Sequence, residues 1–190
     1  MKTLVIVGND KLGRKFIKSI NSEKFEIILD ESSSIKRVFK LIQRGSLKFP
    51  LIFKMFLSDF FRKDYPLSKE YKSIKNNSDL INIIKDGCIK QIVVYRGGLI
   101  VSKKVIGLGV KILNIHCAKI PEYGGIGVLD RALKDKAYEQ EATLHIITEG
   151  IDEGEVVIVE PYKLEESLSY MENENAAYEA GIKLFNKYFV

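Results

Sequence analysis

Three polar residues in the second half of the chain are of types that could act on a carbonyl group. Asn114 and His116 stand two residues apart, where an apolar run from Val110 to Ile115 passes into a loop. In a strand, that spacing places both side chains on one face. An amide donor beside an imidazole can stabilise a carbonyl oxygen as it becomes negative.

A carboxylate could join this pair from the segment Glu149–Gly154, whose two glycines permit a tight turn. Asp152 lies in this segment, 36 residues after His116. From there it could raise the pKa of His116 and relay a proton. The chain has two histidines, so His116 has only His145 as a rival for proton transfer near neutral pH. Taken alone the pattern is weak, because an Asn and a His at a strand end are more often structural than catalytic.

The elements that must position these residues follow an α/β pattern. An apolar run at Leu4–Val7, a helical repeat over Lys11–Ile20 and a second apolar run at Phe25–Leu29 predict a strand, a helix and a strand. Such an opening is typical of a sheet of parallel strands. We expect further strands over 91–95, 110–115, 141–148 and 156–159, helices over 77–86, 102–107, 126–136 and 165–189, mostly helix over 31–62 with a break near Pro50, and a polar loop over 63–76.

The glycines after the first strand do not form a nucleotide-binding motif. The run Gly8–Gly13 reads GNDKLG, which lacks the second glycine of a dinucleotide fingerprint and the Gly-Lys-Ser/Thr of a phosphate-binding P-loop. We therefore expect a tight turn packed on the sheet, although backbone amides at such a junction can receive an anion.

Composition excludes several classes of protein. The chain has 190 residues, 46% of them apolar, which is ample for a core and excludes a disordered chain. Two cysteines, Cys88 and Cys117, are too few for a disulfide scaffold and fit a reducing cytoplasm. No signal peptide or transmembrane segment is expected, because the longest apolar stretches are short or interrupted by charges.

Basic and aromatic residues gather in one segment. From Lys36 to Lys75 the chain carries eleven Lys or Arg and three acidic residues, a charge of +8 that leaves −3 for the rest. A solvated helical face is the commoner reason for such a segment, and an anionic partner is the alternative. Six of the ten Phe residues lie between Phe39 and Phe61, which favours core packing or a homodimer contact over a helix on a membrane surface.

Two longer motifs resemble those of a known family. Residues 113–125 read LNIHCAKIPEYGG and resemble the signature N-x-H-x-x-x-x-P-x-Y-x-G of the folate-dependent formyltransferases. Residues 143–156 read TLHIITEGIDEGEV and resemble the second signature of that family, T-x-H-x-x-x-x-G-x-D-x-G. Both motifs stand at the family's usual separation, and the resemblance covers about residues 91–160 and extends plausibly to residue 1.

The resemblance implies a fold, a reaction and a set of site residues. The fold would be Rossmann-like, with a central, mostly parallel sheet flanked by helices in one catalytic domain over residues 1–190. The reaction would move a formyl group from 10-formyltetrahydrofolate to an amine, without a metal. Asn114, His116 and Asp152 match the catalytic Asn, His and Asp of the family, whereas Cys117 would be a small filler. Main-chain groups would hold the pterin, at positions that match Leu99, Ile100, Val101, Ile147, Glu149, Gly150 and Ile151.

Departures from the family pattern narrow the choice of the amine that accepts the formyl group. Residues 8–12 lack the G-x-G-S/T-N phosphate loop of the glycinamide ribonucleotide enzyme, and 190 residues leave no room for the extra domain of the methionyl-tRNA enzyme. We therefore expect a small, phosphate-bearing amine, above all a nucleotide-linked amino sugar, with the basic segment helping to hold the diphosphate. A glycinamide ribonucleotide formyltransferase and a formyltetrahydrofolate hydrolase stay open, as do a ligand-binding and a nucleic-acid-binding module, although no nucleic-acid motif is present.

Overall fold

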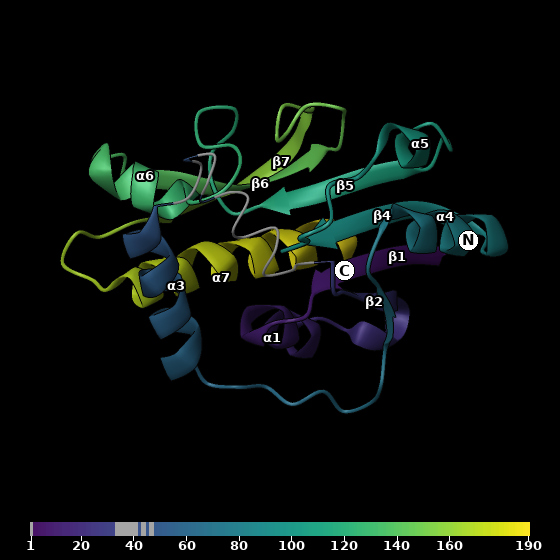
Figure 1. Ribbon diagram of the computed structural model, residues 1–190, viewed down its shortest axis with the longest axis horizontal. Coiled ribbons are helices and arrows are strands. Elements are labelled where there is room, and N and C mark those ends of the chain that lie inside the picture. Colours follow the sequence, from purple (N-terminus) through teal and green to yellow (C-terminus); the bar gives the residue numbers. More distant parts are fainter. Residues whose placement is uncertain (1, 33–41, 43–44, 46–47) are drawn as a thin grey trace.

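A seven-stranded sheet forms the centre of the computed structural model, which describes residues 2–32, 42, 45 and 48–190 (Figure 1). The strand order is β3-β2-β1-β4-β5-β6-β7, and the five strands from β3 to β5 are parallel. Strand β6 runs opposite to these five, and β7 reverses direction again, so that β5–β6 and β6–β7 are antiparallel pairs. The strands are β1 (Lys2–Gly8), β2 (Glu26–Asp30), β3 (Lys72–Ile74), β4 (Ile89–Tyr95), β5 (Lys111–His116), β6 (Glu139–Ile146) and β7 (Val156–Lys163).

Helices cover both faces of this sheet. They are α1 (Lys11–Ser19), the 3-10 turn η1 (Ser22–Lys24), α3 (Phe49–Phe61), α4 (Asn77–Asp86), α5 (Lys103–Ile106), α6 (Val128–Lys134) and α7 (Tyr170–Phe189). Figure 1 shows the long helix α7 running along the sheet, with α3 beside its first turns. Within the described part of the chain, no helix is long and apolar enough to cross a bilayer.

Alternation along the strands divides the core in two. Val5 and Val7 of β1 point to the face covered by α1 and α7, where the rings of Phe16 and Tyr95 stack with centroids 3.9 Å apart. The intervening residues of β1 point to the opposite face, which α4 and α5 cover. The buried members of this second cluster are Leu4, Ile6, Ile28, Ile74, Leu80, Ile84, Ile92, Val94, Val105 and Ile112. The predicted strand–helix–strand opening and the α/β class are therefore confirmed.

The structure corrects the expected polar loop over 63–76. Residues 72–74 form the edge strand β3, which pairs with β2 through the register Asp30↔Ile74. Its single buried side chain, Ile74, gives no period-2 pattern that a sequence could reveal. The pairing partner lies more than forty residues earlier in the chain, so only the tertiary structure shows the strand.

One predicted helix begins later than expected, and another begins at an expected break near Pro50. Helix α7 starts at Tyr170 rather than at residue 165, because Ser169 and Glu172 form a capping box that fixes its first turn. Helix α3 starts at Phe49 with Pro50 in its first turn, a position that suits proline because no N–H is needed there. The rest of the helix expected over 31–62 lies mostly outside the described residues.

Buried charge ties α3 to the body of the protein. The guanidinium of Arg62, just after α3, lies 2.6 Å from the carboxylate of Glu174 in α7, and both side chains are about 95% buried. Arg62 also donates to the Asn175 side chain at 3.1 Å. From α1, the Lys11 ammonium donates to the carbonyls of Asp59 and Arg62 at 2.6 and 3.0 Å. It thereby donates to carbonyls at the end of α3 that have no partner within the helix.

We predict that Arg62→Met lowers the free energy of unfolding by about 3 kcal/mol, because it leaves the Glu174 carboxylate buried with one partner fewer. Urea unfolding measures the change. Arg14→Met is the matched control, since Arg14 pairs with the largely exposed Asp64 at 2.9 Å and its loss should cost below about 1 kcal/mol. Equal losses in the two variants would contradict a structural role for the buried pair.

Candidate active site

The end of β5 presents two polar side chains on one face. Leu113 and Ile115 belong to the first core cluster and Ile112 to the second, so Asn114 and His116 project on the side of the second cluster. Both residues are half-buried. The predicted shared face is therefore confirmed. It lies at the carboxyl end of the parallel strands, where ligands of α/β sheets bind.

Asp152 lies against this pair, as the turn in the sequence predicted. One carboxylate oxygen, Oδ2, is 3.3 Å from Nδ1 of His116 and accepts the backbone N–H of Gly125 at 2.8 Å. The other, Oδ1, accepts from the Asn114 amide at 3.3 Å. Asp152 itself has φ +53, a left-handed conformation that Asp tolerates better than most residues. The structure thus brings the three predicted residues together.

Close packing of glycines fixes the turn that carries Asp152. A Cβ on Gly154 would lie 1.7 Å from the Ile146 carbonyl oxygen at the end of β6. A Cβ on Gly124 would lie 3.3 Å from the Cβ of Asp152. The turn therefore sits directly on the sheet, where a side chain on residue 154 has no room and one on residue 124 would be tightly placed.

His145 is a fourth member of the cluster that the sequence analysis did not assign. It is the direct cross-strand partner of Asn114 in the β5–β6 ladder. Its Nε2 is 3.1 Å from the Asn114 amide nitrogen and 3.3 Å from Oδ1 of Asp152, and the side chain is 2% exposed. The spacing of seven between His145 and Asp152 was visible in the sequence. Nothing there showed that β6 would reverse and pair beside Asn114.

The ring of His145 can form a hydrogen bond with either Asn114 or Asp152. Its Nδ1 lies 3.1 Å from the Ile146 carbonyl, which only accepts, so this nitrogen carries a proton. In the neutral ring, Nε2 then accepts from the Asn114 amide. In the protonated ring, Nε2 donates to Asp152. His145 therefore stabilises the positions of both residues without needing contact with a ligand.

Burial and hydrogen bonds set the protonation of the cluster. Burial lowers the pKa of His116, although Asp152 and the Tyr123 carbonyl, 2.8 Å from Nε2, favour the charged ring. Burial also raises the pKa of Asp152, but the hydrogen bond with His145, the proximity of His116 and the Gly125 N–H outweigh it and lower the pKa to about 2. These two shifts disagree about the charge on His116. The Gly125 N–H and the Asn114 amide donate to the carboxylate whatever the charge on either imidazole, and both favour its ionised form.

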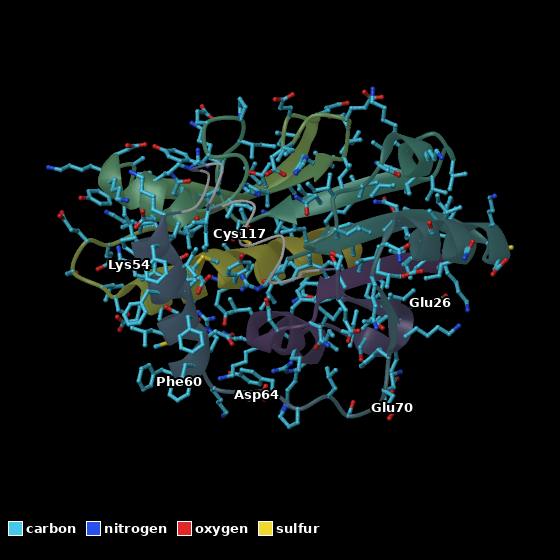
Figure 2. All side chains as sticks on the ribbon, viewed as in Figure 1. Glu26, Lys54, Phe60, Asp64, Glu70 and Cys117 are labelled. Carbon is cyan, nitrogen blue, oxygen red and sulfur yellow. The ribbon has the colours of Figure 1, made fainter. Side chains whose placement is uncertain are left out.

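Cys117, next to His116, is not placed as a nucleophile. The residue lies over α7 in the middle of the molecule (Figure 2) and belongs to the first core cluster. Burial raises the pKa of its thiol to about 12, so the reactive thiolate is scarce at neutral pH.

Two loops expected to hold a pterin lie on the face of the second core cluster. Leu99, Val101 and Ile147 pack against that cluster, and an ion pair of 2.5 Å between Lys103 and Glu149 joins the loops. Ile100 and Ile151 are 57% and 60% exposed, so each loop offers an apolar side chain to a flat ring.

Several main-chain groups of these loops already have partners. The Leu99 N–H donates to the buried Asp30 carboxylate, the Ile100 carbonyl accepts from Asn77, and the Ile147 N–H donates to Ile112. Main-chain recognition of a pterin would therefore fall on the other groups of these loops.

The predicted tight turn at Gly8–Gly13 is confirmed, and it carries a negative charge. The Asp10 carboxylate caps α1 by accepting the Gly13 N–H at 2.8 Å and pairs with Arg96 at 2.5 Å. A Cβ on Gly13 would lie 1.8 Å from the Gly8 carbonyl oxygen, so helix and strand are in close contact.

The basic segment is partly committed to internal ion pairs. Arg62 is buried against Glu174, and Lys54 lies 3.1 Å from Asp130. Lys48, Lys63, Lys69, Lys72 and Lys75 are exposed. The basic residues Lys36, Arg37, Lys40 and Arg44 lie outside the described residues. Among the residues that are described, no group of three or more His, Cys, Asp or Glu could hold a metal ion.

One protein family matches the chain by comparison with known proteins. The family model described as formyl transferase matches residues 64–187. Methionyl-tRNA formyltransferase of Finegoldia magna is 28% identical over 97 residues, which are 50% of this chain and 31% of that protein. The curated relatives that we compared are thus matched over about a third of their length.

Solved structures share the fold. Phosphoribosylglycinamide formyltransferase from Anaplasma phagocytophilum aligns with a TM-score of 0.67 at 12% identity, covering 98% of this chain and 83% of that one. A sugar N-formyltransferase from Shewanella sp. FDAARGOS_354 aligns with a TM-score of 0.65 at 18% identity, covering 98% and 68%. The Rossmann-like fold expected from the two motifs is therefore confirmed, and its sheet is mostly parallel, with only β6 running in the opposite direction among the strands of the described residues.

We predict that Asp152 makes the protein acid-sensitive. Because folding lowers its pKa from 3.8 to about 2, its stabilisation is complete above pH 3.8 and is lost as the pH falls towards 2. Between pH 5 and pH 2 the free energy of unfolding of the wild type should fall by about 2 kcal/mol more than that of Asp152→Asn. Asp86→Asn, at the exposed end of α4, should behave like the wild type. Parallel curves for the wild type and Asp152→Asn would show that the carboxylate is not stabilised in the fold.

Proposed function

The chain belongs to the formyl transferase family, and from that premise we propose that it transfers a formyl group from 10-formyltetrahydrofolate to a primary amine. One observation carries the proposal. The Asp152 carboxylate lies 3.3 Å from both the His116 ring and the Asn114 amide, at the carboxyl end of β5. A carboxylate, an imidazole and an amide donor in contact can transfer protons and stabilise an oxyanion, the two tasks of acyl transfer to an amine.

Asn114 and His116 have separate tasks in this proposal. Bound 10-formyltetrahydrofolate supplies the formyl carbon that the amine attacks. The Asn114 amide donates to the oxygen that becomes negative, for which it gives up one of its present contacts with Asp152 and His145. His116 faces the same oxygen through Nε2, the nitrogen turned away from Asp152, once the Tyr123 carbonyl no longer occupies it.

Asp152 acts through the ring of His116. Its negative charge stabilises the imidazolium whenever the ring takes up a proton from the attacking amine. The proton then leaves on the departing folate nitrogen, so that the ring returns to its first state. Burial lowers the pKa of His116 and so favours the neutral ring, which is the form that can accept a proton.

Two apolar loops support binding of the folate. Ile100 and Ile151 expose more than half of their surface on loops that Lys103 and Glu149 join. We assign the pterin to these loops, residues 99–101 and 147–151, with the formyl group directed towards Asn114. The flanking apolar side chains can cover a flat ring, which is how small-molecule sites gain most of their affinity.

For the acceptor we propose a nucleotide-linked amino sugar. The first turn of α1 supports this choice over glycinamide ribonucleotide, because the Asp10 carboxylate occupies the helix N-terminus that a phosphate would otherwise approach. The exposed Lys75 follows β3 at the carboxyl edge of the sheet and is available to a diphosphate. The single catalytic domain over residues 1–190 and the absence of a metal from the reaction stay predictions.

A panel of acceptors tests the proposal. We expect amino-sugar nucleotides to accelerate the release of tetrahydrofolate from 10-formyltetrahydrofolate, followed by absorbance, with a KM that rises with salt because the acceptor is anionic. Glycinamide ribonucleotide, methionyl-tRNA and water are the competing acceptors. Acceleration by one of them alone would replace the sugar assignment, and release with none of the amines present would identify a hydrolase.

His116→Ala should lower kcat/KM by about 100-fold, because both proton transfer and charge stabilisation depend on the ring. Lys111→Ala, at the exposed start of the same strand, is the control and should keep the wild-type rate. Thermal unfolding of both variants separates a lost function from a lost fold. A folded His116→Ala enzyme with an unchanged rate would remove His116 from the mechanism.

A further inference from the structure

Helix α3 exposes an unusual number of aromatic side chains. Phe49, Phe53, Phe56, Phe60 and Phe61 are 73%, 56%, 64%, 64% and 70% exposed. Figure 2 shows Phe60 at the outer side of α3, pointing away from the sheet. The rings of Phe56, Phe60 and Phe61 also touch one another, with centroids 6.4 and 5.1 Å apart. We call these five residues the phenylalanine face.

Four of the five residues of the phenylalanine face lie opposite the side by which α3 packs on the protein, and Phe61 lies beside them, about 100° further round the helix from Phe60. Phe49, Phe53, Phe56 and Phe60 follow the spacing i, i+4, i+7, i+11, which confines them to roughly 60° of the helix surface at 3.6 residues per turn. Leu51 and Ser58, the buried residues of α3, lie on the other side. Arg62 continues that buried side into its ion pair with Glu174. The contacts of α3 with the body of the protein therefore leave this face exposed.

Its size is that of a binding surface. With about 200 Å² for a whole Phe side chain, the five exposed fractions amount to roughly 650 Å². Contiguous apolar patches beyond a few hundred Å² mark contacts with proteins or membranes. Aromatic side chains on one helix face are one of the features of helices that lie in a membrane interface.

The charges around the phenylalanine face are of one sign. Lys48 at the start of α3 and Lys63 beyond its end are exposed, and Lys54 within it is exposed but paired with Asp130. The one acidic residue of the helix, Asp59, is half-buried, and Asp64 is paired with Arg14. The exposed residues of the helix and its ends, residues 48–63, are thus apolar or cationic, with no carboxylate among them.

We propose that the phenylalanine face binds an anionic lipid surface, with α3 lying in the plane of the headgroups. The Phe side chains enter the boundary of the acyl region and Lys48 and Lys63 contact lipid phosphates, whereas Lys54 keeps its ion pair with Asp130. Repulsion between lysines disfavours a contact of this face with a second copy of the chain. In an antiparallel pair of α3 helices Lys48 would meet Lys63 of the other copy, and in a parallel pair each lysine would meet itself. The proposal goes beyond formyl transfer and does not rest on it.

The location of α3 connects this surface to the candidate active site. A Cβ on Gly127 would lie 2.7 Å from Leu51, and Lys54 pairs with Asp130 of α6. The same loop donates the Gly125 N–H to Asp152. A membrane-bound α3 therefore holds the loop beside the cluster close to the lipid surface.

Sedimentation of the full chain with large vesicles tests the proposal. We expect binding to vesicles of phosphatidylcholine with phosphatidylglycerol, little binding to phosphatidylcholine alone, and release at about 0.5 M salt. The double variant Phe53→Ser/Phe56→Ser should bind at least tenfold more weakly. Its side chains are exposed, so folding is not at stake, and circular dichroism checks this. The matched control Tyr188→Ser/Val190→Ser removes two exposed apolar side chains from the end of α7 and should bind like the wild type.

Three results would overturn the proposal. Equal binding to charged and uncharged vesicles would remove the role of the lysines, and equal losses in both double variants would remove the phenylalanine face. No binding to any vesicle would exclude a lipid surface. In that case, analytical ultracentrifugation would show whether the wild type is a dimer. A dimer that dissociates in the variant Phe53→Ser/Phe56→Ser would assign the face to a second copy of the chain.

Discussion

The carboxylate of Asp152 is the contact on which the candidate site depends. It accepts from the Gly125 backbone and the Asn114 amide and lies 3.3 Å from His116 and His145. These partners come from β5, β6 and the loop after β5, so one side chain joins three segments. A buried carboxylate with this many donors is held in one position and stays ionised. The left-handed backbone of Asp152 and the close packing of Gly154 are the local conditions for this arrangement.

The change of strand direction at β6 gives the site its fourth member. Five parallel strands end at one edge of the sheet, and β6 starts the return along β5. Because β5 and β6 are antiparallel neighbours, His145 stands directly beside Asn114 in the ladder. A parallel pairing of β5 and β6 would place a different residue beside Asn114. The reversal therefore brings the two signatures of the family into contact.

Charge is used in two different ways on the two sides of α3. On the buried side, Arg62 and Glu174 form a pair that fixes the helix to α7. On the outer side, exposed lysines border a surface of Phe side chains. The +8 of the segment from Lys36 to Lys75 is therefore not one uniform surface. Part of it stabilises the fold, part of it is exposed, and four of its residues lie outside the described part of the chain.

The sequence by itself determined the class of fold and three of the four residues in the cluster. Buried strands and amphipathic helices carry local patterns, and all four residues stand in the two motifs, although only Asn114, His116 and Asp152 were assigned a role from them. Strand β3, the place of His145 and the exposure of the Phe residues were decided only by the tertiary structure. Each depends on which segment packs against which, and the packing of residues far apart in the chain leaves no periodic pattern in the sequence.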